Sequence, residues 1–427
     1  MAEIKAFKGL RYTDKAGSIC ELVCPPYDII SDTQRMEYLE RNPMNIIRLE
    51  LPKGENAYSQ AGATLEAWLK DEILKKDSEA GIYVYEMEFT VKKSETKKVK
   101  GFISLVKLEE FSKGVVLPHE ETLSKAKTDR FNLMSKTFCN FSQIYSLYMD
   151  EDNSTFSFID RASSRKADIE VSDNDGVIHR LWCVYDKDTI EMVSRQFDTK
   201  KLYIADGHHR YETALNFHKH LCEEGISNQD SLSGYVCMML VNMENDGLVV
   251  FPTHRIVRDL PDFDAKQVIE KCSEYFEITD GNNISEAEDK LSMLYDEGKK
   301  AFALYTGKKT YRMLVLKDNS VMKKLLPDMS DSYCQLDVSI LHSLVLERLF
   351  GIDKENMANQ KNLTYTRNAD EAISAVDEGI ANCAFILNPT RVSEIRDVAL
   401  AGEKMPQKST YFYPKLITGL VMNKFKD

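Results

Sequence analysis

The sequence predicts an α/β (α+β) fold in two domains, at residues 1–256 and 257–427, and three observations support this prediction. The chain has 427 residues, whereas single domains usually hold about 100–200 residues. Hydrophobic residues make up 43% and charged residues 29%, which is typical of a globular protein and not of a disordered one. Segments with helical periodicity and short strand-like segments alternate along both halves.

The first half mixes helical and strand-like patterns. Residues 58–75 carry apolar side chains at helical spacing, which predicts a helix. Residues 81–93 and 97–111 alternate like the two strands of a hairpin, with a charged turn near residues 94–98. Residues 114–134 combine a Pro, a His and many charges without a clear period. They predict a long surface loop that runs into a helix.

Buried strands and further helices are predicted after residue 230. Two short apolar runs, 233–243 and 248–257, predict two buried strands with a turn at residues 245–247. No internal repeat is visible at periods of 20–50 residues, which disfavours a solenoid. The other predicted elements are a helix over 263–278, strands over 301–307 and 310–317, an amphipathic helix over 338–351, a helix–turn–strand unit over 371–390 and a helix stopped at Gly402.

Charge and cysteine usage limit the classes of function. The formal charge is −12, and acidic chains are poor binders of nucleic acid and of anionic membranes. No apolar run reaches the ~18 residues of a membrane span, and the first residues lack the apolar core of a secretory signal. The nine cysteines are scattered and contain no Cys-x-x-Cys pair. These features predict a cytoplasmic protein with reduced thiols.

The most informative segment is KLYIADGHHRYETAL, which begins at Lys201 and has the pattern of a strand, a turn and a helix. Such a turn brings unpaired backbone N–H groups to the positive end of a helix, which suits a phosphate. Gly207 allows a ligand to approach the backbone, and the guanidinium of Arg210 matches phosphate oxygens. The candidate phosphate ligands are Gly207, His208, His209 and Arg210, after the acidic Asp206.

Other interpretations of this segment stay open at this stage. Asp206 could be a simple helix N-cap, with the two histidines exposed in the first helical turn. Paired histidines can also bind zinc, but adjacent histidines point in different directions and no carboxylate stands at a matching spacing. A metal site is therefore the less favoured alternative.

Two further segments carry candidate site residues. His119 and Glu120 follow Pro118, and a carboxylate near a phosphate site can accept the proton of a hydroxyl nucleophile. Near the C-terminus, a cation and two hydroxyls stand together at Lys408, Ser409 and Thr410. Taken alone, the first segment is more typical of a solvated surface and the second of a packed C-terminal strand. Weaker signals are the candidate pocket loops at 24–28 and at Arg48 and Glu50, whereas Lys125, Lys127 and Arg130 are expected to be solvated.

Together these motifs resemble a known family. The Asp-Gly-His-His-Arg segment at 206–210 resembles the corresponding motif of the ParB/sulfiredoxin superfamily. The Pro-His-Glu segment at 118–120 and the tail from residue 384 onward are similar to segments of the free serine kinases in that superfamily. The whole chain also resembles a large bacterial and archaeal family catalogued as a conserved domain of unknown function.

The resemblance implies a nucleotide-binding ParB/sulfiredoxin-like core with insertions, to which residues 384–420 of the second domain contribute. It implies phosphoryl transfer from ATP, ADP or pyrophosphate, with Mg²⁺, to the hydroxyl of free L-serine. Glu120 would be the base and Asp206 would assist at the reacting centre. Residues 207–210 would hold the donor phosphates, while His119 and residues 408–410 would line the substrate pocket.

The resemblance also leaves an alternative function. ParB-type folds use nucleotides to regulate binding to partners, so a non-catalytic nucleotide-dependent regulator is the second hypothesis. A redox enzyme of the sulfiredoxin type is disfavoured, because no Cys lies in the turn at 206–210. The chain also departs from the kinases in two ways: a longer insertion separates Glu120 from Asp206, and Tyr411 and Phe412 replace an Arg and a His.

Overall fold

The computed structural model describes residues 1–91, 95–120, 122, 124–228 and 230–426 and divides into two compact units. The first contains Met1–Pro118, Thr122–Val249 and Pro414–Asp427, and the second contains His119–Glu121 and Val250–Tyr413. Each unit therefore combines segments that are far apart in the sequence. The predicted domain boundary, between residues 256 and 257, falls inside a strand of the second unit.

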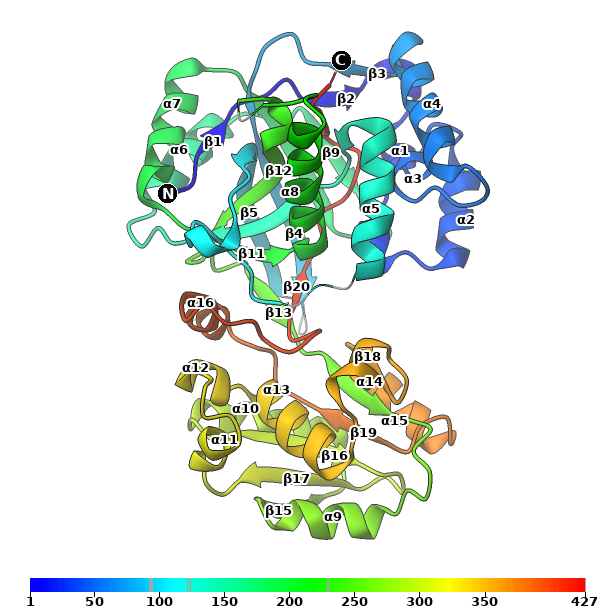
Figure 1. The fold of residues 1–427 in the computed structure, drawn as a ribbon, viewed down its shortest axis with the longest axis vertical. Coiled ribbons are helices and arrows are strands. Elements are labelled where there is room, and N and C mark those ends of the chain that lie inside the picture. The colour runs from blue at the N-terminus through cyan, green and yellow to red at the C-terminus, as the bar shows by residue number, and fades with distance from the viewer. Residues whose placement is uncertain (92–94, 121, 123, 229, 427) are drawn as a thin grey trace. The chain divides into compact units, whose positions relative to one another are not determined.

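The first unit alternates helices and strands along most of its length (Figure 1). Its elements are β1 (Ile4–Lys5), β2 (Leu10–Tyr12), α1 (Ile19–Leu22), α2 (Asp32–Arg41), α3 (Ile47–Glu50), α4 (Ala57–Lys70), β3 (Leu74–Lys76), β4 (Ile82–Val91), β5 (Glu95–Lys107), β6 (Val116–Leu117), α5 (Ser124–Thr137), β7 (Cys139–Asn140), β8 (Ile144–Tyr148), α6 (Ser154–Ala162), β9 (Ile169–Ser172), β10 (Ile178–Val184), α7 (Lys187–Gln196), β11 (Leu202–Asp206), α8 (His208–Glu223), β12 (Tyr235–Asn242) and β21 (Asn423–Lys424).

A nine-stranded mixed sheet organises this unit. The strand order is β6-β11-β8-β12-β5-β4-β10-β9, with β1 also paired to β5. The β6–β11 and β8–β12 pairs are parallel, whereas the other neighbours are antiparallel. The predicted hairpin is confirmed, because β4 and β5 pair from Val91↔Glu95 onward. Of its predicted turn, Ser94 lies outside the described residues and 95–98 belong to β5.

The predicted helix after residue 206 packs on this sheet. Helix α8 presents Tyr211, Ala214 and Leu215 to the main hydrophobic core, and α5 lies beside it (Figure 1). All eight residues of β12 are buried, as expected for a central strand covered on both faces. The core thus fixes the start of α8 at the end of strand β11.

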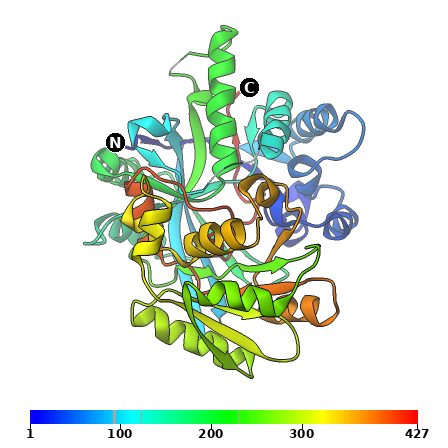
Figure 2. The same ribbon diagram turned by 60° about the horizontal axis from the view of Figure 1, so that its bottom comes forward.

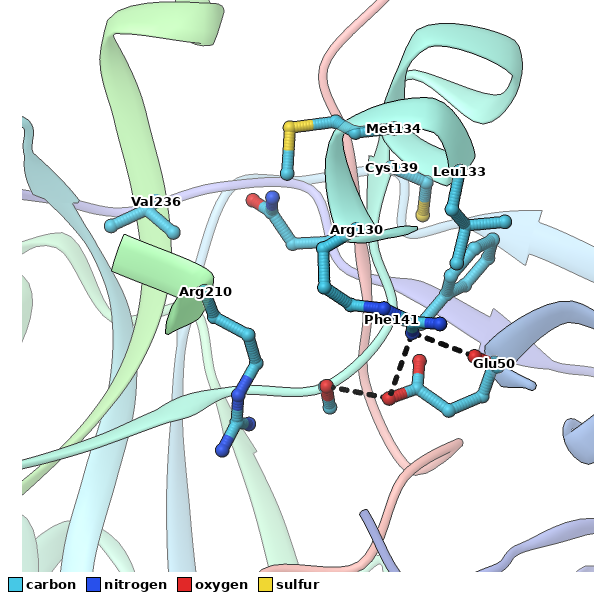
Figure 3. Close-up of a pocket in the computed structure, with 10 residues that line it drawn as sticks. Glu50, Arg130, Leu133, Met134, Cys139, Phe141, Arg210 and Val236 are labelled. Atoms are coloured by element: carbon cyan, nitrogen blue, oxygen red, sulfur yellow. Dashed lines mark hydrogen bonds and ion pairs between the residues drawn. The ribbon is translucent and has the colours of Figure 1, made fainter. Parts of the chain in front are cut away.

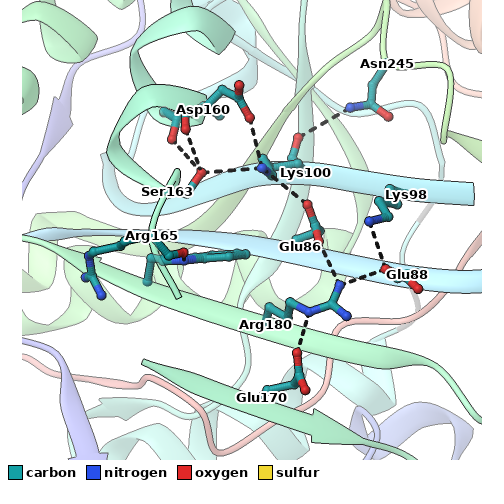
Figure 4. A network of polar contacts seen from close by, with 12 residues as sticks. Glu86, Glu88, Lys98, Lys100, Asp160, Ser163, Arg165, Glu170, Arg180 and Asn245 are labelled. Atoms are coloured by element: carbon teal, nitrogen blue, oxygen red, sulfur yellow. Dashed lines mark hydrogen bonds and ion pairs between the residues drawn. The ribbon is translucent and has the colours of Figure 1, made fainter. Parts of the chain in front are cut away.

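A polar network lies across three neighbouring strands, β4, β5 and β10 (Figure 4). The Arg180 guanidinium donates to Glu86 at 3.0 Å and to Glu88 at 2.8 Å, and the Lys100 ammonium lies 3.3 Å from Glu86. The charges of Arg180 and Lys100 compensate the carboxylate of Glu86, which is only 7% exposed. The network explains how this face of the sheet holds buried charge.

The second unit has its own sheet (Figure 2). Its elements are β13 (Val249–Phe251, which begins at the last residue of the first unit), β14 (His254–Val257), α9 (Ala265–Ser273), β15 (Phe276–Gly281), α10 (Ile284–Asp296), β16 (Ala301–Tyr305), β17 (Tyr311–Leu316), α11 (Ser320–Leu325), α12 (Asp331–Cys334), α13 (Asp337–Ile340), a π-helix (Leu341–Leu349), α14 (Lys354–Ala358), β18 (Leu363–Thr366), α15 (Ala369–Asp377), β19 (Cys383–Ile386), α16 (Val392–Leu400) and β20 (Tyr411–Tyr413).

The six strands of this sheet are antiparallel, in the order β15-β17-β16-β19-β14-β18. Helices α10 and α15 cover one face through small residues such as Ala303 and Ala384. Phe302 and Phe385, at alternating strand positions, join a second aromatic cluster that includes Phe350 at the end of the π-helix. The sheet is therefore packed on both faces.

Several elements predicted from the sequence differ from the structure in where they end or in their type. The helix predicted over 263–278 ends at Ser273, because β15 is recruited into the sheet by pairing with β17. The helix predicted over 338–351 is present, but most of it is a π-helix. Of the two buried strands predicted over 233–243 and 248–257, the first is β12 of the nine-stranded sheet. Pro252 divides the second segment into β13, which is half-buried and pairs with β20, and β14, which belongs to the six-stranded sheet.

Two further observations concern the chain as a whole. Within the described residues, no helix combines the length and the apolar character that a membrane crossing needs. All nine cysteines are free thiols, and Cys20 is exposed.

Candidate functional site

The turn between β11 and α8 adopts the predicted strand–Gly–helix geometry. Gly207 stands at the helix N-cap with φ +98°, a left-handed conformation that side chains with a Cβ rarely adopt. A Cβ at this position would also lie 3.0 Å from the Arg210 guanidinium. Gly207 has no side chain that could cap the helix, and the positive end of the α8 dipole lies at this turn.

Asp206, the last residue of β11, is clamped between two cations. Its Oδ2 accepts a hydrogen bond of 2.5 Å from Arg210, and its Oδ1 pairs with the Lys415 ammonium. Burial alone would raise the pKa of Asp206, but the charges of Lys415 and Arg210 outweigh burial and hold the pKa well below its usual range. The carboxyl of Asp206 is therefore ionised at neutral pH.

The N-cap interpretation of Asp206 is not what the structure shows, because the cap is Gly207 and the Asp206 oxygens bind cations. Arg210 is only 9% exposed and also donates to the Gln143 carbonyl. Burial lowers the pKa of Arg210, but Asp206 and Asp28 reverse this effect and the guanidinium stays charged. Arg210 thus anchors the turn from inside the first unit.

Lys415 was not among the residues that the sequence singled out. It lies in the first unit and reaches Asp206 across 209 positions of sequence. Its side chain is 12% exposed, so the ammonium borders the surface beside the turn. One signal was present: Lys415 is the single cation between Thr410 and Asn423.

A small cavity of about 40 Å³ lies beside Arg210, and its lining mixes apolar and charged side chains (Figure 3). Glu50 and Arg130 line it, and Ser142 donates to the Glu50 carboxylate at 2.9 Å. Burial raises the pKa of Glu50, although Arg130 opposes this shift. This volume holds a few water molecules and not a nucleotide. Glu50, from one of the predicted pocket loops, is thus next to the turn.

Arg130 differs from its prediction as a solvated charge. It is 6% exposed and donates to the Glu50 carbonyl at 2.7 Å, and the Tyr27 ring lies 4.0 Å from its guanidinium. Tyr27 comes from the other predicted pocket loop. The Nε and Nη2 of Arg130 also donate to the Asp129 carboxylate, so this ion pair and the Tyr27 ring together stabilise the buried cation.

The second unit brings His119 and Glu120 together with residues 405–410. Glu120 forms a parallel β-bridge with Met405, and its Oε1 accepts a 2.7 Å hydrogen bond from the Lys408 N–H. His119 Nε2 lies 3.0 Å from the hydroxyl of Thr410. These two segments are almost 290 positions apart in the sequence, and the pairing positions the Glu120 carboxylate.

Lys408 and Ser409, which were predicted to line the substrate pocket, make contacts within the second unit that shape the loop at 405–410. Lys408 has φ +56° and contributes its backbone N–H, while its side chain is exposed. The Ser409 hydroxyl donates to the Pro406 carbonyl at 2.5 Å and closes the turn. The structure therefore gives both residues a shaping role in the 405–410 loop, and their contact with substrate stays a prediction.

No ready metal site accompanies these groups. The described residues contain no group of three or more His, Cys, Asp and Glu side chains arranged to hold a metal. Asp206 is the carboxylate at the α8 turn, and both of its oxygens are already paired with cations. These residues alone do not fit a resident Mg²⁺ ion, which usually needs free carboxylate oxygens.

The fold and the turn together define a mixed α/β protein in which a strand, a glycine and a helix N-terminus follow one another. Residues 4–339 match the family described as "Protein of unknown function (DUF1015)", and the chain belongs to this family. Comparison with curated proteins finds no match.

Several solved structures are similar to this chain. A free serine kinase in complex with AMP is 14% identical, with 74% of this chain and 92% of that chain covered and a TM-score of 0.35. A conserved hypothetical protein from Pyrococcus furiosus is 15% identical, with 78% and 98% covered and a TM-score of 0.35. C-terminally truncated SbnI from Staphylococcus aureus is 10% identical, with 75% and 87% covered and a TM-score of 0.37. The assignment to the ParB/sulfiredoxin superfamily stays a prediction.

Proposed function

We propose that this protein is a kinase that transfers a phosphoryl group from ATP, ADP or pyrophosphate to the hydroxyl of free L-serine and forms O-phosphoserine. The observation that carries the proposal is the β11–α8 turn, where Gly207 opens a helix N-terminus beside the Asp206–Lys415–Arg210 cluster. The motif resemblance at residues 118–120, 206–210 and 384–420 supplies the reaction class.

The donor phosphates bind at the start of α8 in this proposal. Backbone N–H groups from Gly207 to Arg210 and the positive helix end favour a phosphate, and His208 and His209 add donors. Lys415 supplies a second positive charge at the edge of the turn. Such fixed positive groups stabilise the charge that spreads over the transferring oxygens.

Asp206 keeps these cations in place. Because its carboxylate stays ionised, it holds Lys415 and Arg210 by charge and cannot take a proton from serine at neutral pH. Its proposed catalytic assistance is therefore electrostatic. Any Mg²⁺ would arrive on the donor phosphates, as is usual for nucleotide substrates, and would neutralise part of their charge.

Glu120 is the proposed general base. Its Oε1 is held by the Lys408 N–H, and no hydrogen bond among the described residues uses Oε2, which can accept a proton. As the serine oxygen forms its bond to phosphorus, the bond from phosphorus to the leaving oxygen breaks and the serine proton moves to Glu120. A positioned base of this kind typically contributes ~10²–10⁴-fold in rate.

The test uses Glu120→Gln, which keeps the Oε1 acceptor for Lys408 but cannot take up the proton. Protein is incubated with L-serine, Mg²⁺ and ATP, ADP or pyrophosphate, and O-phosphoserine is measured by mass spectrometry. We expect Glu120→Gln to lower kcat by about 10²–10⁴-fold and to leave nucleotide affinity nearly unchanged. The matched control is Glu297→Gln, at an exposed glutamate of the same unit.

Two results would contradict the proposal. Unchanged turnover in Glu120→Gln would remove Glu120 from the mechanism. Nucleotide binding by the wild-type protein without phosphoserine from any donor would favour the alternative, a nucleotide-dependent regulator.

A further inference from the structure

Arg255 in β14 is a buried guanidinium with an unusual set of partners. It is 1% exposed, and its Nη2 donates to the carbonyls of Lys408 at 3.1 Å and Gln407 at 3.4 Å. Its Nη1 donates to the Thr253 carbonyl, and its Nε donates to His342 at 3.2 Å. Among the described residues, no carboxylate lies within ion-pair distance of Arg255.

One peptide group links Arg255 to the proposed base. The Gln407–Lys408 peptide accepts from Arg255 through its carbonyl and donates to Glu120 through its N–H, at 2.7 Å. A donor on the carbonyl side polarises the peptide and strengthens the hydrogen bond on the N–H side. The same Nη2 holds the next carbonyl, so Arg255 fixes both peptides that flank Lys408.

The conformation of Lys408 explains why the loop needs this anchor. Lys408 has φ +56°, which is unfavourable for a residue with a Cβ and persists only where the surroundings hold it. Arg255 holds its carbonyl, and Glu120 accepts from its N–H. Loss of either contact would let the backbone relax and would move the Lys408 N–H away from Glu120.

His342 supports Arg255 from the other side. It lies in the π-helix, a rare form that is frequent at functional sites. Burial and the Arg255 charge lower the pKa of His342 well below its usual value, so the ring is neutral and Nε2 accepts from Arg255. The guanidinium is thereby held at its Nε, Nη1 and Nη2 atoms.

The charge of Arg255 is costly to bury without a carboxylate. Burial lowers the pKa of Arg255 to about 10, while Tyr365 and Glu120 act in the opposite direction. Glu120 is therefore the acidic side chain whose charge acts on Arg255. A hydrophobic side chain at this position of β14 would be buried at a lower free-energy cost. The presence of a guanidinium here therefore needs an explanation other than stability.

We infer that Arg255 is a positioning residue for Glu120: it holds the Gln407–Lys408 peptide, which in turn fixes the Glu120 carboxylate. The geometric part of the inference concerns this unit alone. Its catalytic consequence rests on the proposed function, in which Glu120 is the base.

The first test needs no activity. Hydrogen exchange of the Lys408 amide is compared in the wild type, Arg255→Met, Arg255→Lys and His342→Gln. We expect exchange at least ~10-fold faster in Arg255→Met, because its protection depends on the held peptide, and a smaller effect in the other two. The control is Arg312→Met, a partly exposed arginine on β17 of the same unit, which should leave Lys408 unchanged.

The amides of β16 and β19 report whether the unit is folded. If Arg255→Met also exposes them, Arg255→Lys and His342→Gln decide the matter, because both retain a hydrogen-bonding side chain at the position. Unchanged exchange at Lys408 in a folded Arg255 variant would overturn the inference.

The second test measures kinetics. We expect Arg255→Met to lower kcat for phosphoserine formation by about 10–100-fold with little change in the nucleotide KM, since a misplaced group costs rate more than binding. Arg255→Lys should recover part of the loss. Equal loss of kcat in Arg255→Lys and Arg255→Met together with unaltered Lys408 exchange would contradict positioning. If Lys408 exchanges faster in Arg255→Met but the wild type forms no phosphoserine, the positioning contact is supported and the proposed function is overturned.

Discussion

The cluster of Asp206 with Lys415 and Arg210 makes a quantitative prediction about stability. Asp206→Asn removes the anion and leaves two largely buried cations side by side, which should cost about 3–5 kcal/mol of unfolding free energy. Lys415→Met leaves Asp206 paired with Arg210, so a smaller loss of about 1–3 kcal/mol is expected. These are large fractions of the ~5–15 kcal/mol that stabilise a typical protein.

The double variant separates the pair from its surroundings. Once Asp206 is neutral, loss of Lys415 removes a cation that has no partner, so Asp206→Asn with Lys415→Met should cost less than the sum of the two single changes. A coupling of about 1–3 kcal/mol is expected for directly interacting buried charges.

Urea unfolding followed by tryptophan fluorescence is the appropriate assay. Both tryptophans of the chain, Trp68 and Trp182, lie in the first unit together with the cluster, so the signal reports on that unit. The control is Lys15→Met, which breaks a salt bridge to Glu72 whose side chains are both more than half exposed. Exposed pairs contribute little, at most about 1 kcal/mol.

The pH dependence has a defined sign. The pKa of Asp206 is lower in the folded state than its ordinary value of 3.8, so its contribution is present above pH 4 and is lost as the pH falls further. The stability gap between wild type and Asp206→Asn should therefore narrow below pH 4. The reasoning would be refuted if Asp206→Asn cost no more than Lys15→Met, or if the two single changes were simply additive.

Two more predictions concern Gly207 in the same turn and Asp337 in the second unit. Gly207→Ala should lower the unfolding free energy of the first unit by about 1–3 kcal/mol, because φ +98° and the close Arg210 guanidinium both oppose a Cβ. Urea unfolding measures this loss. Nucleotide titration of the same variant should show weaker binding. Burial raises the pKa of Asp337 to about 7, so the folded state retains a proton that the unfolded chain has released, and stability falls as the pH rises from 4 to 7. Asp337→Asn should therefore raise the unfolding free energy above that of the wild type by up to about 4 kcal/mol at pH 8 and by nothing at pH 4. Hydrogen exchange of residues 337–349 across this pH range measures the difference. A gain in stability that does not depend on pH would contradict the explanation.

The parts of the fold that sequence predicts well are those with strong local patterns. The β4–β5 hairpin alternates over long strands, and the β11–α8 turn combines a short apolar strand, a glycine and a helical stripe. Local patterns fail where pairing decides the outcome. Phe276–Gly281 becomes a strand because β17 lies beside it, and the π-helix at 341–349 depends on packing that periodicity does not encode.

The candidate site shows the same limit. Residues 206–210 form one contiguous motif, and their turn is visible in the sequence. Lys415 and Arg255 were missed as site residues, since each owes its place to partners that are distant in the sequence, such as Asp206 or the Gln407 carbonyl. Arg130 was expected to be solvated, but it also donates to the distant Glu50 carbonyl. A lone cation in an apolar segment, as at Lys415, is the signal that can find such residues.

The most direct test of the central claim is the product of the reaction. Wild-type protein, Glu120→Gln and Lys415→Met are each incubated with L-serine, Mg²⁺ and ATP, ADP or pyrophosphate, and O-phosphoserine is quantified alongside nucleotide binding. The account predicts phosphoserine from the wild type with at least one donor, loss of turnover without loss of binding in Glu120→Gln, and weaker binding in Lys415→Met. Binding that survives in Lys415→Met, or the absence of phosphoserine with every donor, would contradict it.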